Sequence, residues 1–325
     1  MKKRFASLLA WLYGLVVRLS QWSYRILPFR IRKVQARVIS VGNITWGGTG
    51  KTPLVIKLAQ EMTAHYGRKV AVLTRGYGDD EVQEMRKKLQ DIPLLVGRDR
   101  VKTAREAVEK HGAQYLILDD GFQHLRLHRD LDVVNINSTQ PFGPGGLIPD
   151  GTLREPLSSL ARADVFILTK SNIGSKNVAW IRQKIEQIKP KAAIYEAVHR
   201  PVQFADLQQE RVGGLHEVRG RKVAVISAIA DPYSFEKTVE SLGAEIALAA
   251  RFDDHHEFTR EELTDFAAHC RELGCSDVVT TEKDSFRLLP ALRQYDFLKG
   301  LHFRALQIEF QIQDEDDFVR RCLNR

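Results

Sequence analysis

The chain has 325 residues, of which 43% are hydrophobic and 28% are charged. This length predicts two domains, and the composition is that of a globular protein rather than a disordered or collagen-like chain. Its three cysteines form no C-x-x-C pair. A disulfide scaffold and a cysteine zinc site are therefore not expected, and a reducing compartment is favoured.

The positive charge of the chain is concentrated at its N-terminus. Residues 1–37 contain nine basic side chains and no acidic one, and the formal net charge of the whole chain is +8. Acidic and basic residues nearly balance in the remainder, so the body of the chain has no overall basic bias toward a nucleic-acid backbone. The sequence therefore predicts no nucleic-acid partner, and nothing in it implies a protein partner.

Residues 1–36 are predicted to form a basic amphipathic segment that associates with a membrane surface. Only thirteen residues separate Arg4 from Arg18, fewer than the roughly 20 that a transmembrane helix requires. No small-residue cleavage site follows, as it would in a signal peptide. Apolar residues recur instead at the spacing of an interfacial helix; they are Phe5, Leu8, Leu9, Leu12, Leu15, Val16 and Leu19. The alternative is a helix packed on the protein's own core.

Short β-branched runs alternate with helical patterns from residue 37 to residue 191. This alternation predicts βαβ units and a parallel sheet. The predicted strands are 37–43, 69–76, 92–97, 115–120, 132–137 and 164–170, and the predicted helices are 52–65, 80–90 and 99–111. A long loop rich in glycine and proline lies at 141–156, and loops of this length are often functional.

A second set of strands and helices predicts a smaller α/β domain over residues 221–325. The expected strands are 222–230, 245–252 and 277–284, and the expected helices are 232–243 and 259–274. Residues 192–220 have weaker patterning and two adjacent glycines. They are therefore predicted to be a linker between the two domains.

A glycine-rich turn joins a predicted strand to a predicted helix in VISVGNITWGGTGKTP. Glycines let successive N–H groups turn toward an anion, and the helix start adds the positive end of its dipole. Lys51 would reach the β- and γ-phosphates of a nucleotide, and the Thr52 hydroxyl would bind Mg²⁺. The predicted nucleotide-binding residues are Gly47, Gly48, Thr49, Gly50, Lys51 and Thr52. Residues 37–191 are therefore predicted to be a P-loop NTPase-like domain.

The turn departs from the strict pattern G-x-x-x-x-G-K-[ST], which requires glycine where this chain has Thr45. Its GG-x-GK-T core also occurs in ParA-like ATPases, whose additional lysine is replaced here by Trp46. A ParA-like regulatory ATPase that cycles on and off membranes is therefore the alternative function. The missing lysine argues against it, because such switches use that lysine across their dimer interface.

Two adjacent acids end the apolar strand in LILDDG. At the carboxyl end of a parallel strand, Asp119 or Asp120 could hold Mg²⁺ opposite the threonine of the phosphate loop. If the strand continues through both, they point to opposite faces, and the second acid could contact substrate. The chain has no N-K-x-D guanine motif, so ATP is the expected nucleotide.

Seven motifs of the chain occur in an order typical of one family. They are SVGNITWGGTGKTP, LTRGYG, VGRDR, ILDDGFQHLRLHRDLD, GGLIPDGTLREPLSSLARAD, RFDDHHEF and TTEKD. Together they resemble the tetraacyldisaccharide 4′-kinase family of lipid A biosynthesis. The resemblance implies phosphorylation of the 4′-hydroxyl of a tetraacyl glucosamine disaccharide 1-phosphate, with ATP and Mg²⁺. It also implies a place at the cytoplasmic face of the bacterial inner membrane, with the lipid substrate and the membrane surface as partners.

The same resemblance implies roles for individual residues. Lys51 and Thr52 would bind nucleotide and metal, and Glu155 would join Asp119 or Asp120 around Mg²⁺. The neighbouring arginine, Arg154, would neutralise charge on the transferring phosphoryl group.

In the family, an acid paired with a histidine acts as the base. The histidine matches His255. The spacing to VGRDR favours Asp80 as the acid, and Asp79 is the rival; a helix N-terminus is the structural alternative for both. A metal cluster is the alternative for residues 253–256.

Several further polar residues could contact the disaccharide or its 1-phosphate, or could equally be solvated loop residues. They are Arg75, Tyr77, Arg100, His124, Arg126 and His128.

Overall fold

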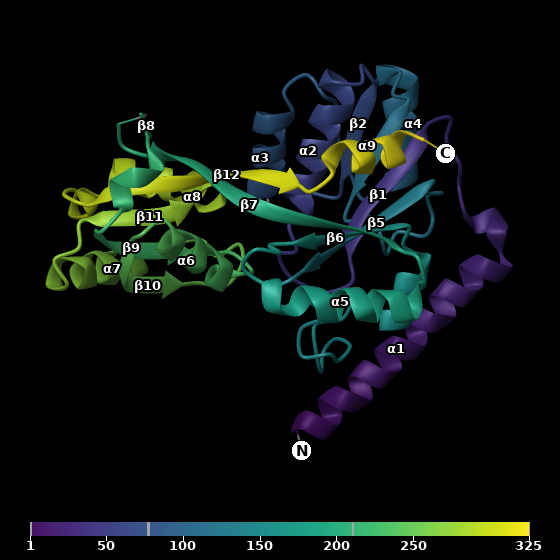
Figure 1. Ribbon diagram of the computed structural model, residues 1–325, viewed down its shortest axis with the longest axis horizontal. Helices are drawn as coiled ribbons and strands as arrows, with labels where there is room; N and C mark the ends of the chain where they lie inside the picture. Colours follow the sequence, from purple (N-terminus) through teal and green to yellow (C-terminus); the bar gives the residue numbers. More distant parts are fainter. Residues whose placement is uncertain (1, 77–78, 210, 325) are drawn as a thin grey trace. The chain divides into compact units, whose positions relative to one another are not determined.

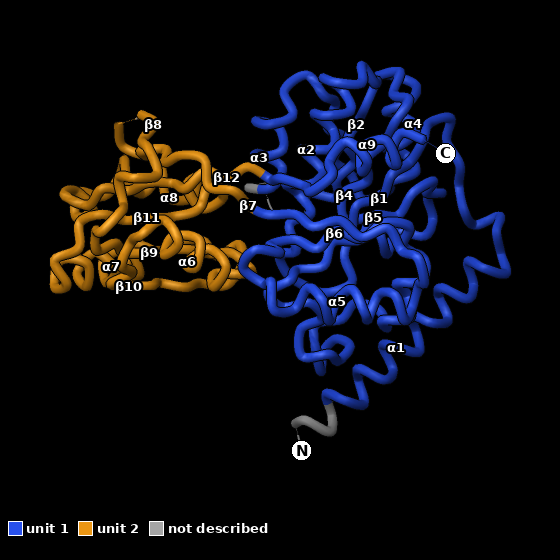
Figure 2. Tube along the Cα trace, viewed as in Figure 1, with its two compact units in different colours: residues 1–198, 310–325 blue, residues 199–309 orange. Residues whose placement is uncertain are grey.

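The computed structural model describes residues 2–76, 79–209 and 211–324. These residues form two compact units (Figure 2), Met1–Val198 with Phe310–Arg325 and His199–Glu309. The chain passes from one unit to the other along β7 (Ala193–Asp206) and returns along β12 (His302–Ile312).

This division differs from the predicted domain boundaries. Residues 192–220, expected to be a linker, include most of β7 together with β8 (Val212–Gly213). Residues 310–325 belong to the first unit, because the end of β12 and the helix after it pack in that unit's core.

The first unit contains a sheet with the strand order β7-β6-β5-β1-β4-β2-β3. Every neighbouring pair is parallel, which confirms the predicted fold class. Because β1 lies between β4 and β5, the loop that follows β1 lies near the middle of the sheet edge where the parallel strands have their carboxyl ends. Ligands of such sheets bind at this edge. The strands besides β7 are β1 (Arg37–Asn43), β2 (Val70–Thr74), β3 (Leu94–Val96), β4 (Tyr115–Asp119), β5 (Leu131–Asn137) and β6 (Val165–Thr169).

Helices cover both faces of this sheet, as α2, α9 and α5 show in Figure 1. One face carries Ile39 and Val41 and packs against α2 (Lys51–Ala64), α3 (Asp79–Leu89) and α9 (Glu315–Leu323). The other face packs against α4 (Arg100–His111) and α5 (Ser175–Ile188). Side chains alternate along each buried strand, so the same strands supply both cores. Helices α5 and α9 were not predicted from the sequence.

Helix α1 (Lys2–Ile26, Figure 1) has large apolar side chains that are exposed to solvent. Trp11 and Val16 are each 64% exposed. Small and polar residues face the unit instead: Ala10 and Gly14 are buried, and the Ser7 hydroxyl donates to Asp150 Oδ2 at 3.2 Å. The apolar stripe thus does not pack on the core of this chain, and the alternative prediction for it was wrong. No helix in the described ranges has the length and hydropathy needed to cross a membrane.

The second unit contains a parallel sheet with the order β10-β9-β11-β12. Its strands besides β12 are β9 (Lys222–Ser227), β10 (Glu245–Arg251) and β11 (Asp277–Thr281). Helices α7 (Arg260–Glu272) and α8 (Glu282–Gln294) cover one face, and α6 (Pro232–Ser241) covers the other. Short 3-10 helices occur at Pro28–Arg30 and Leu157–Arg162 in the first unit, and at Leu215–Val218 and Asp296–Leu298 in the second.

The turn after β4 packs tightly against β1. A Cβ atom on Gly42 would lie 2.6 Å from Cβ of Phe122, so glycine permits this approach. Phe122 is fully buried, and the guanidinium carbon of Arg162 lies 4.4 Å from the centre of its ring. This packing anchors the segment that carries the acids Asp119 and Asp120.

We expect Phe122→Ala to lower the free energy of unfolding by about 3–5 kcal/mol, because truncating a buried phenylalanine leaves a cavity. Chemical denaturation followed by circular dichroism measures this loss. Phe29→Ala is the control, since the Phe29 side chain is 70% exposed and its removal should change stability by less than about 0.5 kcal/mol. Equal losses in the two variants would contradict the anchoring role of Phe122.

Candidate active site

The glycine-rich turn connects β1 to α2 through two left-handed backbone positions. Gly47 has φ 113° and Gly50 has φ 75°, values that glycine adopts without strain. Gly50 is also the residue that caps α2, which begins at Lys51. The turn therefore presents its last N–H groups at the positive end of a helix, as an anion site requires.

Two polar side chains from neighbouring strands hold the carbonyl groups of this turn. The Thr169 hydroxyl at the end of β6 donates to the carbonyl oxygen of Thr49 at 3.0 Å. The Asn135 amide in β5 donates to the carbonyl oxygen of Gly50 at 3.1 Å. Neither residue was predicted from the sequence, although a polar side chain near the end of a fully buried strand is a usable signal.

Three predicted site residues meet at the Asp120 carboxylate. Lys51 Nζ lies 3.5 Å from Asp120 Oδ1, and Nη1 of Arg154 lies 2.9 Å from each carboxylate oxygen. Strand β4 ends at Asp119, and Asp120 has φ 51°. The alternation expected for a continuing strand therefore does not apply, because the left-handed turn sets the direction of the Asp120 side chain.

The two acids differ in their surroundings. The Thr74 hydroxyl donates to Asp119 Oδ2 at 3.0 Å, and burial, followed by the charge of Asp120, raises the pKa of the Asp119 carboxyl. Burial also opposes ionisation of Asp120, but the charges of Lys51 and Arg154 outweigh it and hold the pKa of Asp120 below its ordinary value. Asp120 is therefore an ionised partner of both cations.

A metal ion fits the surroundings of Asp119. Its Oδ1 atom is buried and has no hydrogen-bond partner among the described residues, which is costly for a carboxylate unless a cation or water supplies one. Hard divalent cations such as Mg²⁺ bind carboxylate and hydroxyl oxygens. The hydroxyl of Thr49 is likewise buried without a partner in the described structure.

A short antiparallel pairing explains why the glycine-rich turn has Thr45 where the strict phosphate-loop pattern has its first glycine. Thr45 forms an antiparallel bridge with Leu153, and the Trp46 N–H donates to the carbonyl oxygen of Thr152 at 2.6 Å. The N–H of Arg154 then donates to the carbonyl oxygen of Ile44 at 2.8 Å. Because position 45 is extended and paired, it needs no glycine, and the pairing brings Arg154 to the phosphate turn.

Glu155 was predicted to bind Mg²⁺ together with Asp119 or Asp120, but its hydrogen bonds go to other residues. Its Oε2 atom accepts hydrogen bonds from Arg162 at 2.7 Å and from the Gln21 amide at 2.9 Å. The Tyr13 hydroxyl donates to the carbonyl oxygen of Arg154 at 2.8 Å. Helix α1 therefore bonds directly to the segment that carries the candidate arginine, a contact that no sequence pattern indicated.

Several other candidates form a basic group beside β4. Burial, followed by the charges of Arg100, Arg129 and Arg126, lowers the pKa of His124 to about 4, so this imidazole is neutral at pH 7. Arg100 is buried and donates from Nη2 to the carbonyl oxygen of Asp119 at 3.1 Å. His128 lies with Nε2 3.7 Å from Asp130 Oδ1.

LTRGYG contains two further candidates for contact with the disaccharide. Arg75 is exposed, and Tyr77 lies outside the described residues.

The two candidates for the base pair lie in different units. Helix α3 begins at Asp79, and the side chains of Asp79 and Asp80 lie outside the described part of the structure. His255 belongs to the second unit.

The neighbour of His255 in the sequence has a structural role. The His256 ring stacks on Phe252, with 4.9 Å between ring centres, and its Nε2 lies 2.9 Å from Glu262 Oε2. Among the residues that the structure describes, no group of three or more metal-ligating side chains converges. The metal-cluster alternative for residues 253–256 therefore finds no support.

Comparisons with known proteins agree with the motifs. The family model for tetraacyldisaccharide-1-P 4′-kinase matches residues 3–325. A tetraacyldisaccharide 4′-kinase of Anaeromyxobacter dehalogenans is 40% identical over 310 residues, which cover 89% of this chain and 81% of the relative. Another, from Halothermothrix orenii, is 36% identical over 315 residues, with 86% and 82% coverage. A crystal structure of LpxK from Aquifex aeolicus in complex with ATP matches with a TM-score of 0.71 and 25% identity over 100% of both chains.

A match over nearly the whole chain, with relatives of this identity and coverage, assigns the family: the chain is a member of the tetraacyldisaccharide-1-P 4′-kinases.

Proposed function

We propose that this chain transfers the γ-phosphoryl group of ATP to the 4′-hydroxyl of a tetraacyl glucosamine disaccharide 1-phosphate, in lipid A biosynthesis. The observation that carries the proposal is the meeting of Lys51, Arg154 and Asp120 beside a glycine turn at a helix start. The names of the relatives supply the lipid disaccharide as the acceptor. ATP as the donor is supported by the nucleotide bound to the related LpxK.

In the proposed reaction, the oxygen of the sugar hydroxyl forms a bond to the γ-phosphorus. The bond from this phosphorus to the oxygen that bridges it to the β-phosphate breaks, and ADP leaves with that oxygen. Positioning and charge neutralisation carry most of the catalysis in such transfers. Lys51 and Arg154 supply the positive charge, and the turn's N–H groups orient the triphosphate.

We further propose that the site works with Mg²⁺, which would neutralise charge between the β- and γ-phosphates. The buried Oδ1 of Asp119 supports this assignment, because it has no hydrogen-bond partner among the described residues. Thr52, Asp119 or Asp120, and Glu155 are the proposed ligands. Asp120 is held by Lys51 and Arg154, which makes Asp119 the better candidate of the two.

The proton of the sugar hydroxyl is proposed to pass to the carboxylate of Asp80, with His255 as its partner. This assignment rests on the family's motif order and on the spacing between RGYG and VGRDR. A positioned base of this kind contributes on the order of 10²–10⁴-fold to the rate.

Helix α1 is proposed to bring the site to the cytoplasmic face of the inner membrane. Its exposed side carries large apolar residues, while basic residues lie at both of its ends. An apolar face with flanking Lys and Arg is the pattern of a helix lying in an anionic interface. The acceptor is itself acylated, so it would be met at that surface.

The proposal predicts lipid-dependent phosphoryl transfer by the purified full-length chain. With labelled ATP, label should enter the disaccharide 1-phosphate only when the lipid is supplied, and Lys51→Ala should abolish the transfer. Lys57→Ala is the matched control, because Lys57 lies on the same helix and pairs with Glu61 at 2.9 Å and Glu315 at 3.1 Å. Hydrolysis of ATP that is independent of the lipid, without any labelled lipid, would favour the regulatory ATPase instead.

Substitutions of the two candidate acids at the start of α3, Asp79 and Asp80, should lower turnover to different extents. We expect Asp80→Ala to lower kcat by about 10²–10⁴-fold, as loss of a general base does, and Asp79→Ala to retain most of the activity. Steady-state kinetics with saturating ATP and lipid measure both. Similar losses in the two variants would show that the assignment of Asp80 is wrong.

The exposed side of α1 should control vesicle binding without affecting ATP binding. Val16→Glu places a charge on this side and should weaken binding to anionic phospholipid vesicles several-fold in a flotation assay. Val212→Glu is the control, since Val212 is 62% exposed in the second unit and Val16 is 64% exposed. Unchanged vesicle affinity of Val16→Glu would refute the proposed interfacial role.

A further inference from the structure

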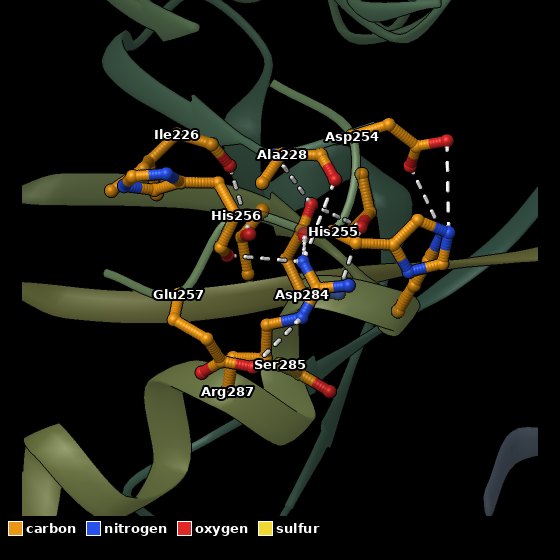
Figure 3. Close-up of polar contacts among 12 residues, drawn as sticks. Ile226, Ala228, Asp254, His255, His256, Glu257, Asp284, Ser285 and Arg287 are labelled. Atoms are coloured by element: carbon orange, nitrogen blue, oxygen red, sulfur yellow. Dashed lines mark hydrogen bonds and ion pairs between the residues drawn. The ribbon is translucent and has the colours of Figure 1, made fainter. Parts of the chain in front are cut away.

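Two motifs of the second unit meet at the carboxyl edge of its sheet. RFDDHHEF begins at the last residue of β10, and TTEKD spans the end of β11 and the start of α8. Figure 3 shows the side chains of Asp254, His255, Asp284 and Arg287 gathered there. The resemblance to known kinases assigns a role only to His255, so the function of TTEKD is open.

The fully buried carboxylate of Asp284 fixes the backbone around this site (Figure 3). Its Oδ2 atom accepts hydrogen bonds from the Ala228 N–H at 3.1 Å and from the Thr281 hydroxyl at 2.6 Å, and its Oδ1 accepts from Arg287 at 3.0 Å. The carbonyl oxygen of Ala228 in turn accepts from the His255 N–H at 3.3 Å. The last acid of TTEKD thus anchors the segment that holds the histidine backbone.

The lysine of the same motif contacts the imidazole ring itself. Lys283 Nζ lies 3.2 Å from His255 Nε2 and 3.0 Å from Asp254 Oδ1, whereas Asp254 Oδ2 lies 3.8 Å from Nε2. An ammonium group can only donate hydrogen bonds, so the ring nitrogen that faces it must be an acceptor without a proton. His255 has φ 66°, a left-handed conformation that is costly outside glycine and that the surrounding contacts maintain.

We propose that Lys283 is a positioning residue that holds His255 neutral, with the ring proton on Nδ1. This inference rests on the proposed kinase function and deepens it. With Nε2 occupied by the ammonium, His255 acts as a hydrogen-bond donor through Nδ1–H. The ring then orients a carboxylate or the sugar hydroxyl, and the proton released in the transfer goes to the carboxylate rather than to the imidazole.

The charged groups that the described contacts bring near the ring lie on its own loop and on helix α8. Asp253 and Asp254 precede His255 on its own loop. Helix α8 supplies Lys283, with Asp284 and Arg287 paired to each other behind it. The segment after β9 contributes the carbonyl group of Ala228. Removing the lysine would take away the positive charge beside Nε2 while the Asp254 carboxylate stays near the ring, and this change favours the imidazolium.

Nitrogen NMR of the full-length chain with ¹⁵N-labelled histidine tests the inference without any substrate. The spectrum of His255→Gln assigns the His255 signals. We expect the wild-type ring to show a protonated Nδ1 and an unprotonated Nε2 at pH 8. A ring with the proton on Nε2 would overturn the proposal, whether or not the protein transfers phosphate.

Variants of the lysine test its effect on the ring. In Lys283→Met, the midpoint of the His255 NMR titration should rise by about one pH unit; Lys283→Arg, which keeps a donor and a charge, should stay near wild type. Lys299→Met is the control, because Lys299 is an exposed lysine of the same unit that pairs with Asp296 at 2.8 Å. A midpoint that does not move in Lys283→Met would refute the inference.

Kinetics separate this inference from the proposed function. In Lys283→Met, the acid limb of the pH profile of kcat/KM for the lipid should move up by the same pH interval, with KM for ATP unchanged, and Lys283→Arg should restore the profile. A pH profile that stays in place while the NMR midpoint moves would overturn the role of Lys283 in the reaction. If the wild-type chain transfers no phosphate to the lipid, the proposed kinase function fails, and the NMR result still decides the state of His255.

Discussion

The arrangement of the first unit's site depends on one carboxylate that balances two cations. Asp120 brings Lys51 and Arg154 together from segments about a hundred residues apart in the chain. Two cations this close to each other and partly withdrawn from water are destabilising unless an anion compensates them. The left-handed turn at Asp120, the packing of Phe122 against Gly42 and the pairing of Thr45 with Leu153 all serve to place these three groups.

The parts of the fold that depend on local sequence were predicted well. Short β-branched runs and glycine or capping residues mark β1, β4 and α2, so their predicted bounds agree with the observed ones to within a few residues. By contrast, β7 contains Pro201 and α8 contains Pro290, and proline obscures both strand and helix patterns. Helix α5 had a usable signal, because Ile181 and Ile185 are buried four residues apart.

The candidate site was predictable only where its residues share a motif. Glycines before a lysine and two acids after an apolar strand have a direct chemical meaning, which is why Lys51 and Asp120 were found. Asn135 and Thr169 act on a turn that lies far from them in the sequence, and Gln21 acts on Glu155. The buried polar positions are visible in the sequence, but the groups that these side chains contact are set by tertiary packing, which no short pattern encodes. Even the departure of Thr45 from the strict motif has a reason only in its pairing with a distant strand.

The attachment of α1 has a mechanical consequence. The Tyr13 hydroxyl donates to the carbonyl oxygen of Arg154, and the Gln21 amide donates to the carboxylate of Glu155. Gly14 lets the helix approach closely, since a Cβ there would lie 2.7 Å from Cδ1 of Leu147. A rotation of the helix would therefore either break these hydrogen bonds or move the backbone that carries Arg154, the proposed charge-neutralising residue.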